Sequence, residues 1–385
     1  MPETELIEDA RALSRAVDVL SREPAVALDC EGNGMHAYRA SLCVVQLCPA
    51  RPDGPAERVY VVDGLAVRDL APLAGLLGPE GPPKVLHDLG FDARLLAERG
   101  VALDQVRDTS VCARFLGAAA TGLVSMLSTR LGVGLDKGLQ SEDWARRPLG
   151  PAALDYLAND VAWLGPLWAS LSAEVDAAGI ADEVDEETRY ALRRAREPVD
   201  EPPPFARVSG YRDLGPRSRA VLVRAAALRE SLAAARDLPP GRLVPNAVVL
   251  QLAKVMPRDL SALRRVWRRF ADDQPEAWLG AVRDGLAAGD ITEVERPWFD
   301  REPKPRDLRE RRWRESALTV WRAAEAEARG VDRQVVLPGH CLSEIAARRA
   351  ETVEALAEVD GFGRCRVERY GEALAALLRA RPDGA

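Results

Sequence analysis

The 385-residue chain is short of several features that would assign a protein to a class directly. None of its six cysteines forms a Cys-x-x-Cys pair and its three histidines show no zinc-ligand spacing, so a structural zinc site is not expected. It has no run of about 18 apolar residues, so no membrane span is expected. Its start is acidic, unlike a signal peptide, so we expect a cytoplasmic protein with reduced thiols.

The chain also lacks an excess of positive charge. Its 60 Asp and Glu residues outnumber its 53 Lys and Arg residues, and the formal net charge of −7 excludes a uniformly basic nucleic-acid-binding surface. Only four of the basic residues are lysines, so arginine, which binds phosphate through two N–H groups at once, supplies nearly all the positive charge. Hydrophobic residues make up 47% of the chain, enough for the cores of two or three domains.

The first part of the chain combines short apolar runs with amphipathic segments. Runs bounded by polar residues and turns predict buried strands at 25–28, 42–47, 59–62 and 84–87. Helical spacing of apolar residues predicts helices at 11–22, 91–99, 111–116, 124–131 and 150–171. Neighbouring strands followed by strand–helix alternation indicate an α/β domain with a mixed sheet, which we place at residues 1–175.

The remainder is predicted to be all helical. A charged helical segment runs into three successive prolines at 202–204, which cannot continue a helix, so residues 176–212 are predicted to form a helical, proline-rich linker. The order helix, Leu/Val-Pro turn, helix and helix then occurs twice, roughly 90 residues apart, which indicates an internal repeat. We therefore expect two small all-α helical bundles at 213–286 and 308–381, joined by a second linker at 287–307.

Acidic residues stand where predicted elements begin or end. Asp29 and Glu31 are two residues apart at the end of a strand, so they project to the same face. Asp92 opens a predicted helix, and Asp160 lies one helical turn after Tyr156. Four carboxylates that meet at one end of the sheet can hold Mg²⁺, which prefers oxygen ligands, for two-metal phosphoryl transfer. Taken singly, each has a structural interpretation, such as a helix N-cap for Asp92.

The order and spacing of these segments resemble the DEDDy 3′–5′ exonucleases and, among them, the ribonuclease D family. The resemblance rests on Leu28–Glu31 (Leu-Asp-Cys-Glu), Leu42–Leu47, Lys84–Asp92, Val106–Thr109, Leu135–Leu149 and Tyr156–Asp160. The two helical repeats, at 218–286 and 308–379, are similar to the helicase-and-ribonuclease-D C-terminal (HRDC) domain, of which ribonuclease D carries two. The resemblance therefore covers nearly the whole chain.

This resemblance implies a fold and a reaction. The fold is a ribonuclease H-like mixed α/β sheet followed by two all-α HRDC bundles. The reaction is hydrolysis from a free 3′ end of RNA, which releases nucleoside 5′-monophosphates and trims tRNA precursors and other structured RNAs. The family uses two divalent metal ions, Mg²⁺ or Mn²⁺. The sequence shows no sign of an obligate protein partner or of a membrane association.

The resemblance also implies a role for each residue of the acidic set. Asp29, Glu31 and Asp160 would ligate the metal ions, with Asp29 as the candidate to bridge them. Asp92 would support the second ion, and Tyr156 would orient the attacking water at the last phosphodiester.

Two positions depart from the family pattern. Gly32 stands where the family usually has Phe, and Asp88 is an added acid close to the predicted metal site. Two other functions stay open: a non-catalytic RNA-binding protein on an exonuclease fold, and a DNA-directed 3′–5′ exonuclease. No residue in the sequence visibly contacts the 2′-hydroxyl that distinguishes RNA from DNA.

The middle of the chain is locally basic. Residues 205–314 hold 23 Arg and Lys against 15 Asp and Glu, so this region is expected to follow an RNA backbone, with a solvated helix face as the alternative. The candidate phosphate contacts are Lys137 and Arg147 near the site, and Arg264, Arg265, Arg268 and Arg269 on one helix. The interleaved tryptophans, including Trp267 and Trp278, are predicted to lie in the core rather than to stack on bases.

Overall fold

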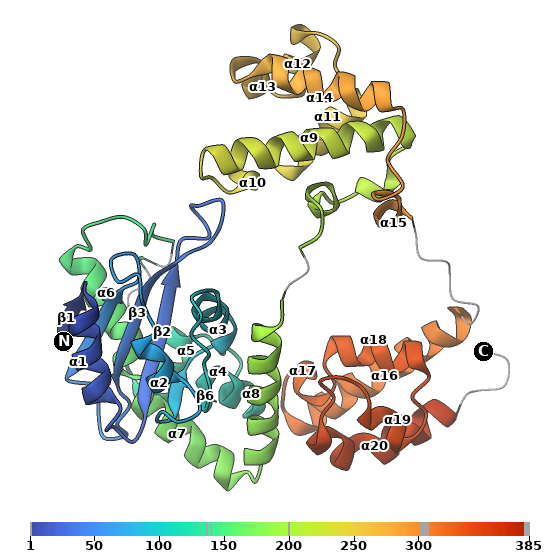
Figure 1. Ribbon diagram of the computed structural model, residues 1–385. Helices are drawn as coiled ribbons and strands as arrows, with labels where there is room; N and C mark the ends of the chain where they lie inside the picture. Colours follow the sequence, from blue (N-terminus) through green and yellow to red (C-terminus); the bar gives the residue numbers. More distant parts are fainter. Residues whose placement is uncertain (1, 136–137, 140, 199–200, 301–307, 381–385) are drawn as a thin grey trace. The chain divides into compact units, whose positions relative to one another are not determined.

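The computed structural model describes residues 2–135, 138–139, 141–198, 201–300 and 308–380 (Figure 1). The chain divides into two compact units, of which the first contains Met1–Gly32, Leu42–Glu197 and Pro305–Ala385, and the second contains Asn33–Ser41 and Pro198–Lys304. The first unit holds a mixed β-sheet, its covering helices and a C-terminal helical bundle, whereas the second contains the other bundle. The predicted class, an α/β domain followed by two all-α bundles, is confirmed.

The sheet in the described residues has the strands β1 (Glu3–Ile7), β2 (Val26–Gly32), β3 (Leu42–Pro49), β4 (Arg58–Asp63), β5 (Lys84–Leu86) and β6 (Val106–Asp108). Their order is β1-β4-β3-β2-β5-β6, with β3 antiparallel to both its neighbours and the other pairs parallel. The apolar runs predicted as strands are β2 to β5. Strands β1 and β6 were not predicted. The acidic residues of β1 interrupt any apolar run, and β6 has only three residues.

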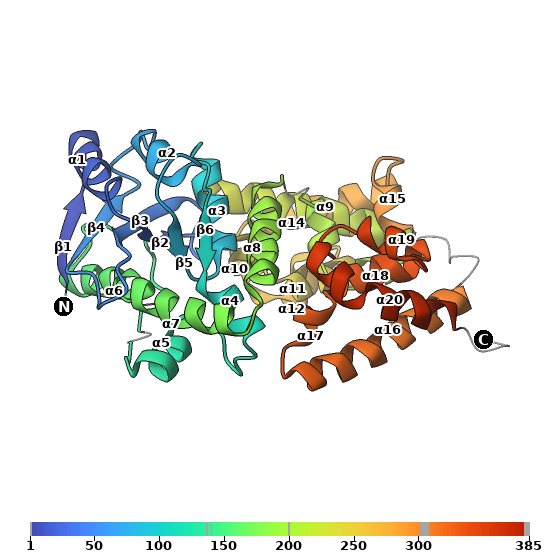
Figure 2. The ribbon, with the colours of Figure 1, turned by 90° about the horizontal axis from the view of Figure 1, so that it is seen from below.

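Helices cover both faces of this sheet, as Figure 2 shows. One face carries α1 (Ala10–Leu20), α2 (Pro72–Leu77) and α3 (Leu89–Glu98), and the other carries α4 (Thr109–Phe115), α5 (Leu123–Leu131), α6 (Pro151–Ala162) and α7 (Leu164–Ala177). Alternation along β2 divides its side chains between the two cores. Val26 and Leu28 enter the core beneath α1–α3, and Ala27 enters the core beneath α4–α7. The same alternation turns Asp29 toward α6.

The segment predicted as a linker begins with helix α8 (Ala181–Arg196), which belongs to the first unit. Val184 and Leu192 are buried in the two cores, and α8 contacts α3, α4 and β6. The linker prediction is therefore corrected for these residues. Charged residues cover most of α8, so its narrow buried stripe did not stand out in the sequence. The helix predicted at 150–171 is likewise divided, because the backbone at Trp163 (φ −98°, ψ 0°) leaves helical geometry.

The two bundles follow one plan. After two short 3₁₀ helices, η1 (Pro204–Arg207) and η2 (Tyr211–Asp213), the first bundle comprises α9 (Pro216–Ala235), α10 (Pro240–Leu243), α11 (Asn246–Val255), α12 (Leu260–Val266), α13 (Arg268–Asp272) and α14 (Pro275–Ala288), with α15 (Arg296–Phe299) after it. The second comprises α16 (Leu308–Arg329), α17 (Arg333–Val336), α18 (Gly339–Arg348), α19 (Val353–Ala357) and α20 (Arg364–Arg379). In both, a long helix and a four-residue helix precede a proline and a ten-residue helix, which confirms the repeat. None of the described helices is long and apolar enough to span a lipid bilayer.

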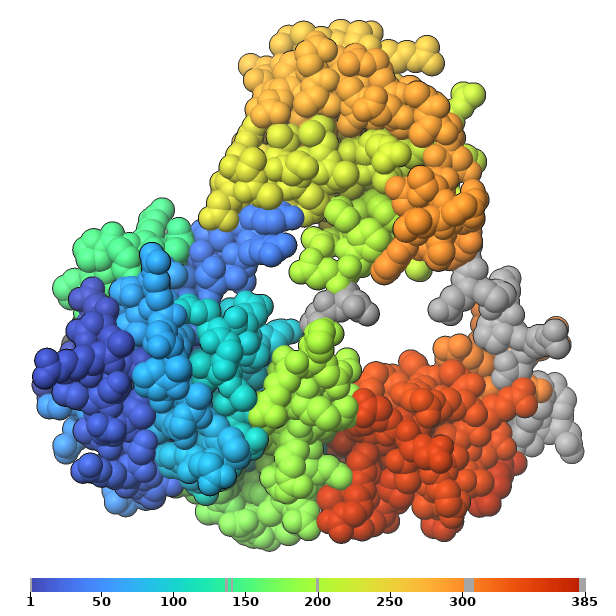
Figure 3. Space-filling view, in the orientation of Figure 1, coloured from blue at the N-terminus to red at the C-terminus, as the bar shows by residue number. Residues whose placement is uncertain are grey.

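The second bundle packs against α8 within the first unit (Figure 3). At the start of α20, the carboxylate of Glu186 accepts hydrogen bonds from the backbone N–H groups of Arg364 (2.6 Å) and Cys365 (2.9 Å). Val335 of α17 is buried in the hydrophobic core beneath α4–α7. The second bundle is therefore joined to the sheet-containing domain by a helix cap and by a shared core.

Candidate active site

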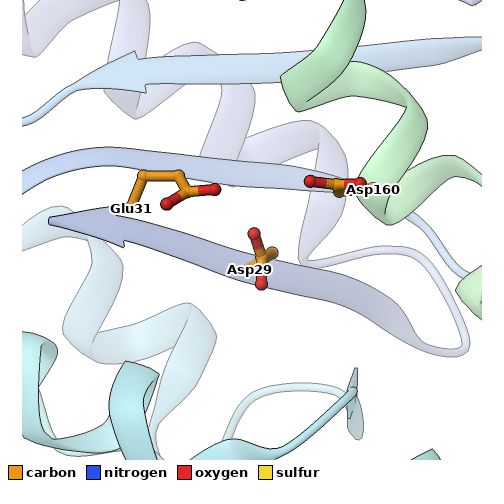
Figure 4. A group of neighbouring side chains, drawn as sticks. All are labelled: Asp29, Glu31 and Asp160. Carbon is orange, nitrogen blue, oxygen red and sulfur yellow. The ribbon is translucent and has the colours of Figure 1, made fainter. Parts of the chain in front are cut away.

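Three carboxylates converge where β2 passes beneath α6 (Figure 4). Asp29 and Glu31 project from the same face of β2, and Asp160 extends from α6. One oxygen atom of each lies within 4.8 Å of the others. Directly after Glu31, the register of β2 with β3 shifts at Gly32. The structure thus brings together three of the acidic residues that the sequence singled out.

Asp92 lies beside the same strand. It is in the first turn of α3, and only 3% of it is exposed. Its Oδ1 accepts a hydrogen bond from the backbone N–H of Cys30 at 3.0 Å. It is not the N-cap of α3, because Asp88 occupies that position. Asp92 therefore holds the strand between the two carboxylates of β2, adjacent to the cluster but outside it.

The clustered carboxylates bind protons more tightly than isolated ones. Burial and the neighbouring Asp160 raise the pKa of Asp29 to about 7, and burial and the Asp29 carboxylate raise the pKa of Glu31 to about 9. Burial also raises the pKa of Asp160 to about 7, although a hydrogen bond with Tyr156 opposes the rise. A cation among such carboxylates stabilises their ionised forms. Because all three groups are hard oxygen donors, they fit a divalent ion such as Mg²⁺ or Mn²⁺.

Tyr156 lies one turn before Asp160 on α6, and its hydroxyl is hydrogen-bonded to the Asp160 carboxylate. Its ring packs against Trp144, with centroids 5.7 Å apart and ring planes at 32°. Because Trp144 is buried, it holds the Tyr156 ring in place. Burial and the Asp160 charge raise the pKa of Tyr156 above its ordinary value, so the hydroxyl keeps its proton at neutral pH.

The three clustered carboxylates and Tyr156 line a cavity of about 710 Å³. Its wall also includes His87, Phe91 and the start of α5. The ring of Phe91 is 43% exposed, and the sequence analysis missed it, although its place directly before Asp92 was a signal. Nδ1 of His87 lies 2.8 Å from Oγ1 of Thr109. Burial lowers the pKa of His87, so the imidazole is neutral at physiological pH.

Asp88, the added acid, is exposed and lines this cavity. Its backbone adopts the left-handed conformation (φ 70°, ψ 69°), which is uncommon for a residue other than glycine. The N–H groups of Asp88 and Leu89 donate to the two carboxylate oxygens of Asp108 at 3.1 and 2.9 Å. These bonds fix the turn between β5 and α3, and they leave the Asp88 carboxylate as an extra negative charge at the cavity wall.

Of the two phosphate contacts predicted near the site, Arg147 is engaged inside the domain. Its Nη2 donates to Oδ1 of Asp63 at 2.8 Å and to the carbonyl oxygen of Cys43 at 3.1 Å. Burial acts to raise the pKa of Asp63, but hydrogen bonds from Arg147 and the backbone lower it overall. The structure thus gives Arg147 a structural partner in place of a phosphate. Lys137 lies outside the described residues.

The remaining candidates are Arg264, Arg265, Arg268 and Arg269, which do not share one helix. The first two lie on α12 and the others on α13, because Trp267 between them is extended (φ −162°, ψ 123°). Arg264 and Arg268 approach Asp272 at 3.8 and 3.5 Å. The predicted single basic helix is therefore two short helices that meet at a bend.

Comparison with known proteins agrees with this architecture. Residues 4–176 match the family model described as a 3′-5′ exonuclease, and residues 218–281 and 311–378 each match the HRDC domain. Ribonuclease D of Granulibacter bethesdensis is 30% identical over 373 residues, which cover 92% of this chain and 89% of that protein. The chain belongs to the ribonuclease D family. Ribonuclease D of Escherichia coli K12 is 30% identical over 261 residues, or 67% of this chain and 68% of that protein.

Solved structures share the fold of this ribonuclease D family member. The crystal structure of Escherichia coli RNase D aligns over the whole of both chains with a TM-score of 0.72 at 24% identity. A protein from Bifidobacterium adolescentis aligns over 99% of this chain and 100% of its own with a TM-score of 0.78 at 22% identity. The likeness concerns the fold, and it confirms the ribonuclease H-like sheet followed by helical domains.

Membership of the ribonuclease D family makes the chain a 3′–5′ exoribonuclease, a hydrolase that acts on RNA. The two helical bundles are its HRDC domains. The exonuclease fold and the cluster of three carboxylates together imply divalent metal ions. Family membership favours the exoribonuclease over the two alternatives that the sequence left open.

Proposed function

We propose that the chain removes nucleotides one at a time from the 3′ end of RNA with two divalent ions, Mg²⁺ or Mn²⁺, and releases nucleoside 5′-monophosphates. The observation that carries the proposal is the convergence of Asp29, Glu31 and Asp160, with one oxygen of each within 4.8 Å of the others. Two-metal phosphoryl transfer requires carboxylates that share ions in this way. Tyr156 lines the same cavity, so a water-positioning group is also at hand.

The carboxylates have distinct parts in this proposal. Asp29, Glu31 and Asp160 would hold the ions, with Asp29 as the candidate ligand shared by both. Asp92 would support the second ion, and its hydrogen bond with the Cys30 N–H fixes β2 against the start of α3. Divalent ions bound there would neutralise the negative charge that builds on the phosphate during in-line displacement.

Tyr156 orients the attacking water. Its hydroxyl is hydrogen-bonded to Asp160 and keeps its proton, so it acts as a hydrogen-bonding group and not as a base. The contact between its ring and Trp144 restricts the hydroxyl to one place in the cavity. A fixed hydroxyl reduces the loss of entropy when the water is brought in line with the phosphodiester.

Phe91 stacks on the terminal base. Its ring is exposed and lines the cavity that contains the carboxylates, and the face of an aromatic ring stacks on any base. This role would compensate for Gly32, which stands where the family usually has Phe. Sequence-tolerant stacking suits an enzyme that removes successive nucleotides from the end of a chain.

The natural substrates that we propose are structured RNAs, tRNA precursors in particular, processed in the cytoplasm without an obligate protein partner. The solved E. coli RNase D is described as an exoribonuclease involved in structured RNA processing, which supports this class of substrate. The proposed contacts to the RNA backbone are Lys137, Arg264, Arg265, Arg268 and Arg269. The affinity that such contacts supply falls as salt rises.

Cleavage of end-labelled nucleic acid tests this function. The chain is incubated with 3′-tailed RNA and with single-stranded DNA of the same sequence, in Mg²⁺, in Mn²⁺ and in chelator. We expect metal-dependent shortening of the RNA from its 3′ end and nucleoside 5′-monophosphates as the product. Asp160→Asn should abolish turnover, and the matched control Asp18→Asn, an exposed position on α1, should not. Turnover by Asp160→Asn, or no cleavage by the wild type, would refute the proposal.

A further inference from the structure

The first HRDC domain contains a pocket of about 250 Å³ between α9, α10, α13 and α14. Aromatic residues form one part of its wall and arginines another: Trp267, Phe270, Trp278, Arg236, Arg242 and Arg269. Its volume is below the roughly 300–1,000 Å³ of pockets for drug-sized ligands. It is therefore suited to one small, flat group rather than to a folded ligand.

The aromatic wall presents one ring to the pocket. Phe270 and Trp278 are buried, with centroids 4.5 Å apart, and they form the base of the wall. Trp267 meets Phe270 edge to face at 5.2 Å and is only half-buried. Its backbone between α12 and α13 is extended, and its ring packs against the edge of the bundle core. Trp278 lies in the core, as predicted, whereas Trp267 packs against the core but is only partly buried.

The acidic residues at the pocket are already paired. Asp273 accepts a hydrogen bond from Nη2 of Arg236 at 2.8 Å. Asp272 faces Arg268 at 3.5 Å and Arg264 at 3.8 Å. These pairs leave no uncompensated carboxylate among the residues that line the pocket in the described part of the chain.

The other two arginines have no anionic partner within the described ranges. Arg242 donates to the carbonyl oxygen of Met35 and approaches Nδ1 of His36, both at 3.0 Å, and neither group is an anion. The guanidinium of Arg269 lies over the ring of Trp267, 5.5 Å from its centroid. The pocket thus combines an accessible indole with two positive charges that no carboxylate neutralises.

We propose that this pocket binds one unpaired nucleobase of the RNA substrate. The base stacks on Trp267, and the guanidinium groups of Arg242 and Arg269 contact the adjoining phosphates. Stacking selects any unpaired base, because every base has a π-face, and it excludes bases that are already paired in a helix. The proposal rests on the proposed function only in that the chain binds RNA. The first HRDC domain would then bind single-stranded segments of the RNA, at a site distinct from the cavity proposed to hold the 3′ end.

Two matched substitutions of Trp267 test the stacking. Binding of a labelled single-stranded oligoadenylate and of a blunt RNA duplex is measured by fluorescence anisotropy, with the full-length chain in chelator so that no RNA is cleaved. Trp267→Leu keeps an apolar side chain and loses the π-face, whereas Trp267→Phe keeps a ring. We expect Trp267→Leu to weaken single-strand binding roughly 5- to 100-fold, the effect of losing one base stack, and Trp267→Phe to retain most of the affinity.

The two RNAs and the salt dependence separate stacking from general attraction. Duplex affinity should be unchanged in Trp267→Leu, as should the slope of log affinity against log salt. Arg269→Gln should instead reduce that slope by about 1, which is the signature of one lost phosphate contact. Arg283→Gln, an exposed arginine of the same domain outside the pocket, is the matched control and should leave the slope unchanged.

Two results would overturn the pocket proposal: single-strand affinity that is equal in wild type and Trp267→Leu, or an equal loss for single strand and duplex in a variant whose circular dichroism is native. Because the assay contains no active metal, it is independent of cleavage. Failure of the exonuclease proposal would show in the Asp160→Asn turnover assay, and failure of the pocket proposal would show here.

Discussion

The three clustered carboxylates make the stability of the folded chain depend on pH. The pKa of Asp29 is about 7 in the folded protein, against an ordinary value of 3.8. Between these values the folded metal-free chain binds more protons than the unfolded chain does. The free energy of unfolding therefore falls as the pH rises from about 4 to about 7, and the stabilising contribution of protonated Asp29 is complete only below that range.

Asp29→Asn is predicted to abolish cleavage and yet to raise the melting temperature of the chelated protein at pH 8. Asparagine keeps the size of the side chain and removes a half-buried charge beside Asp160. Each kcal/mol regained corresponds to roughly 2–4 °C in Tm. Scanning fluorimetry measures the difference, which should shrink at pH 4, where the wild-type carboxyl is largely protonated. A variant that melts at or below the wild-type temperature at pH 8 would contradict the electrostatic argument.

Tyr156→Phe tests the role of the hydroxyl alone, because phenylalanine keeps the ring against Trp144. We expect kcat to fall roughly 10²- to 10⁴-fold, the usual effect of a group that positions a reacting proton or water. The KM for RNA and the affinity for Mn²⁺ should change little. Single-turnover kinetics and a metal titration measure the two effects separately. If metal binding were lost instead, the hydroxyl would act by holding Asp160.

Periodicity alone predicted only the parts of the site whose residues are close in sequence, whereas the resemblance to the exonuclease family implied that Asp29, Glu31 and Asp160 would meet. Strand and helix periodicity placed Asp29 with Glu31, and Tyr156 with Asp160, on common faces. The position of Asp92 depends instead on a hydrogen bond to a backbone group 62 residues away. No local pattern indicates such a contact. The same holds for Arg147, which was predicted to contact phosphate but instead pairs with Asp63, 84 residues away.

At the scale of elements, the helices and strands that could be predicted are those with a clear local pattern of apolar residues. Strands β2 to β5 are apolar runs, and the two helical repeats show their order of helices and prolines directly. Strand β1 was missed because its pairing with β4 joins residues more than 50 positions apart. Helix α8 was predicted as a helix but assigned to a linker, because its buried residues are few: Glu183, Val184, Thr188 and Leu192. In both cases a tertiary neighbour decides the role of the element.

The contact between α8 and α20 gives a prediction at this scale. The Glu186 carboxylate accepts two backbone N–H groups at the start of a 16-residue helix, where negative charge is also favoured by the helix dipole. Glu186→Gln removes the charge and one acceptor, so we expect a loss of about 0.5–2 kcal/mol in the free energy of unfolding, the usual range for a lost N-terminal cap. Urea denaturation measures it.

Asp182→Asn on the same helix is the control for Glu186→Gln. The Asp182 side chain is 86% exposed and lies 3.8 Å from Arg364, so its ion pair contributes little. Equal effects of the two substitutions would show that general charge on α8, and not the cap on α20, holds the second HRDC domain.

On the scale of the whole molecule, the two HRDC domains have different surroundings. The second belongs to the same compact unit as the exonuclease domain, whereas the first forms a unit with the loop Asn33–Ser41. Residues that cap or pack against α8 give the second domain a structural role. The first domain carries the pocket in which Arg242 and Arg269 have no carboxylate partner among the described residues. Under the pocket proposal, the two copies of one fold would have different roles.

Removal of the second HRDC domain is predicted to destabilise the exonuclease domain as well as to change RNA binding. Truncation before Leu308 would delete Val335 from the core beneath α4–α7 and would expose the face of α8 that carries Glu186. We expect a lower melting temperature and self-association, which light scattering after size-exclusion chromatography detects. If the truncated chain were monomeric and had the melting temperature of the wild type, the shared core would contribute little to the stability of the exonuclease domain.

The place of Val335 in the exonuclease core also has a consequence for the order of events during synthesis. A ribosome makes the catalytic strand and all the acidic residues of the site long before it reaches α17. Until that helix has left the exit tunnel, the nascent enzyme lacks part of its own interior. Its nuclease domain is therefore expected to mature late in translation, after nearly the whole polypeptide has emerged, which makes a prematurely terminated chain a poor source of stray RNA degradation.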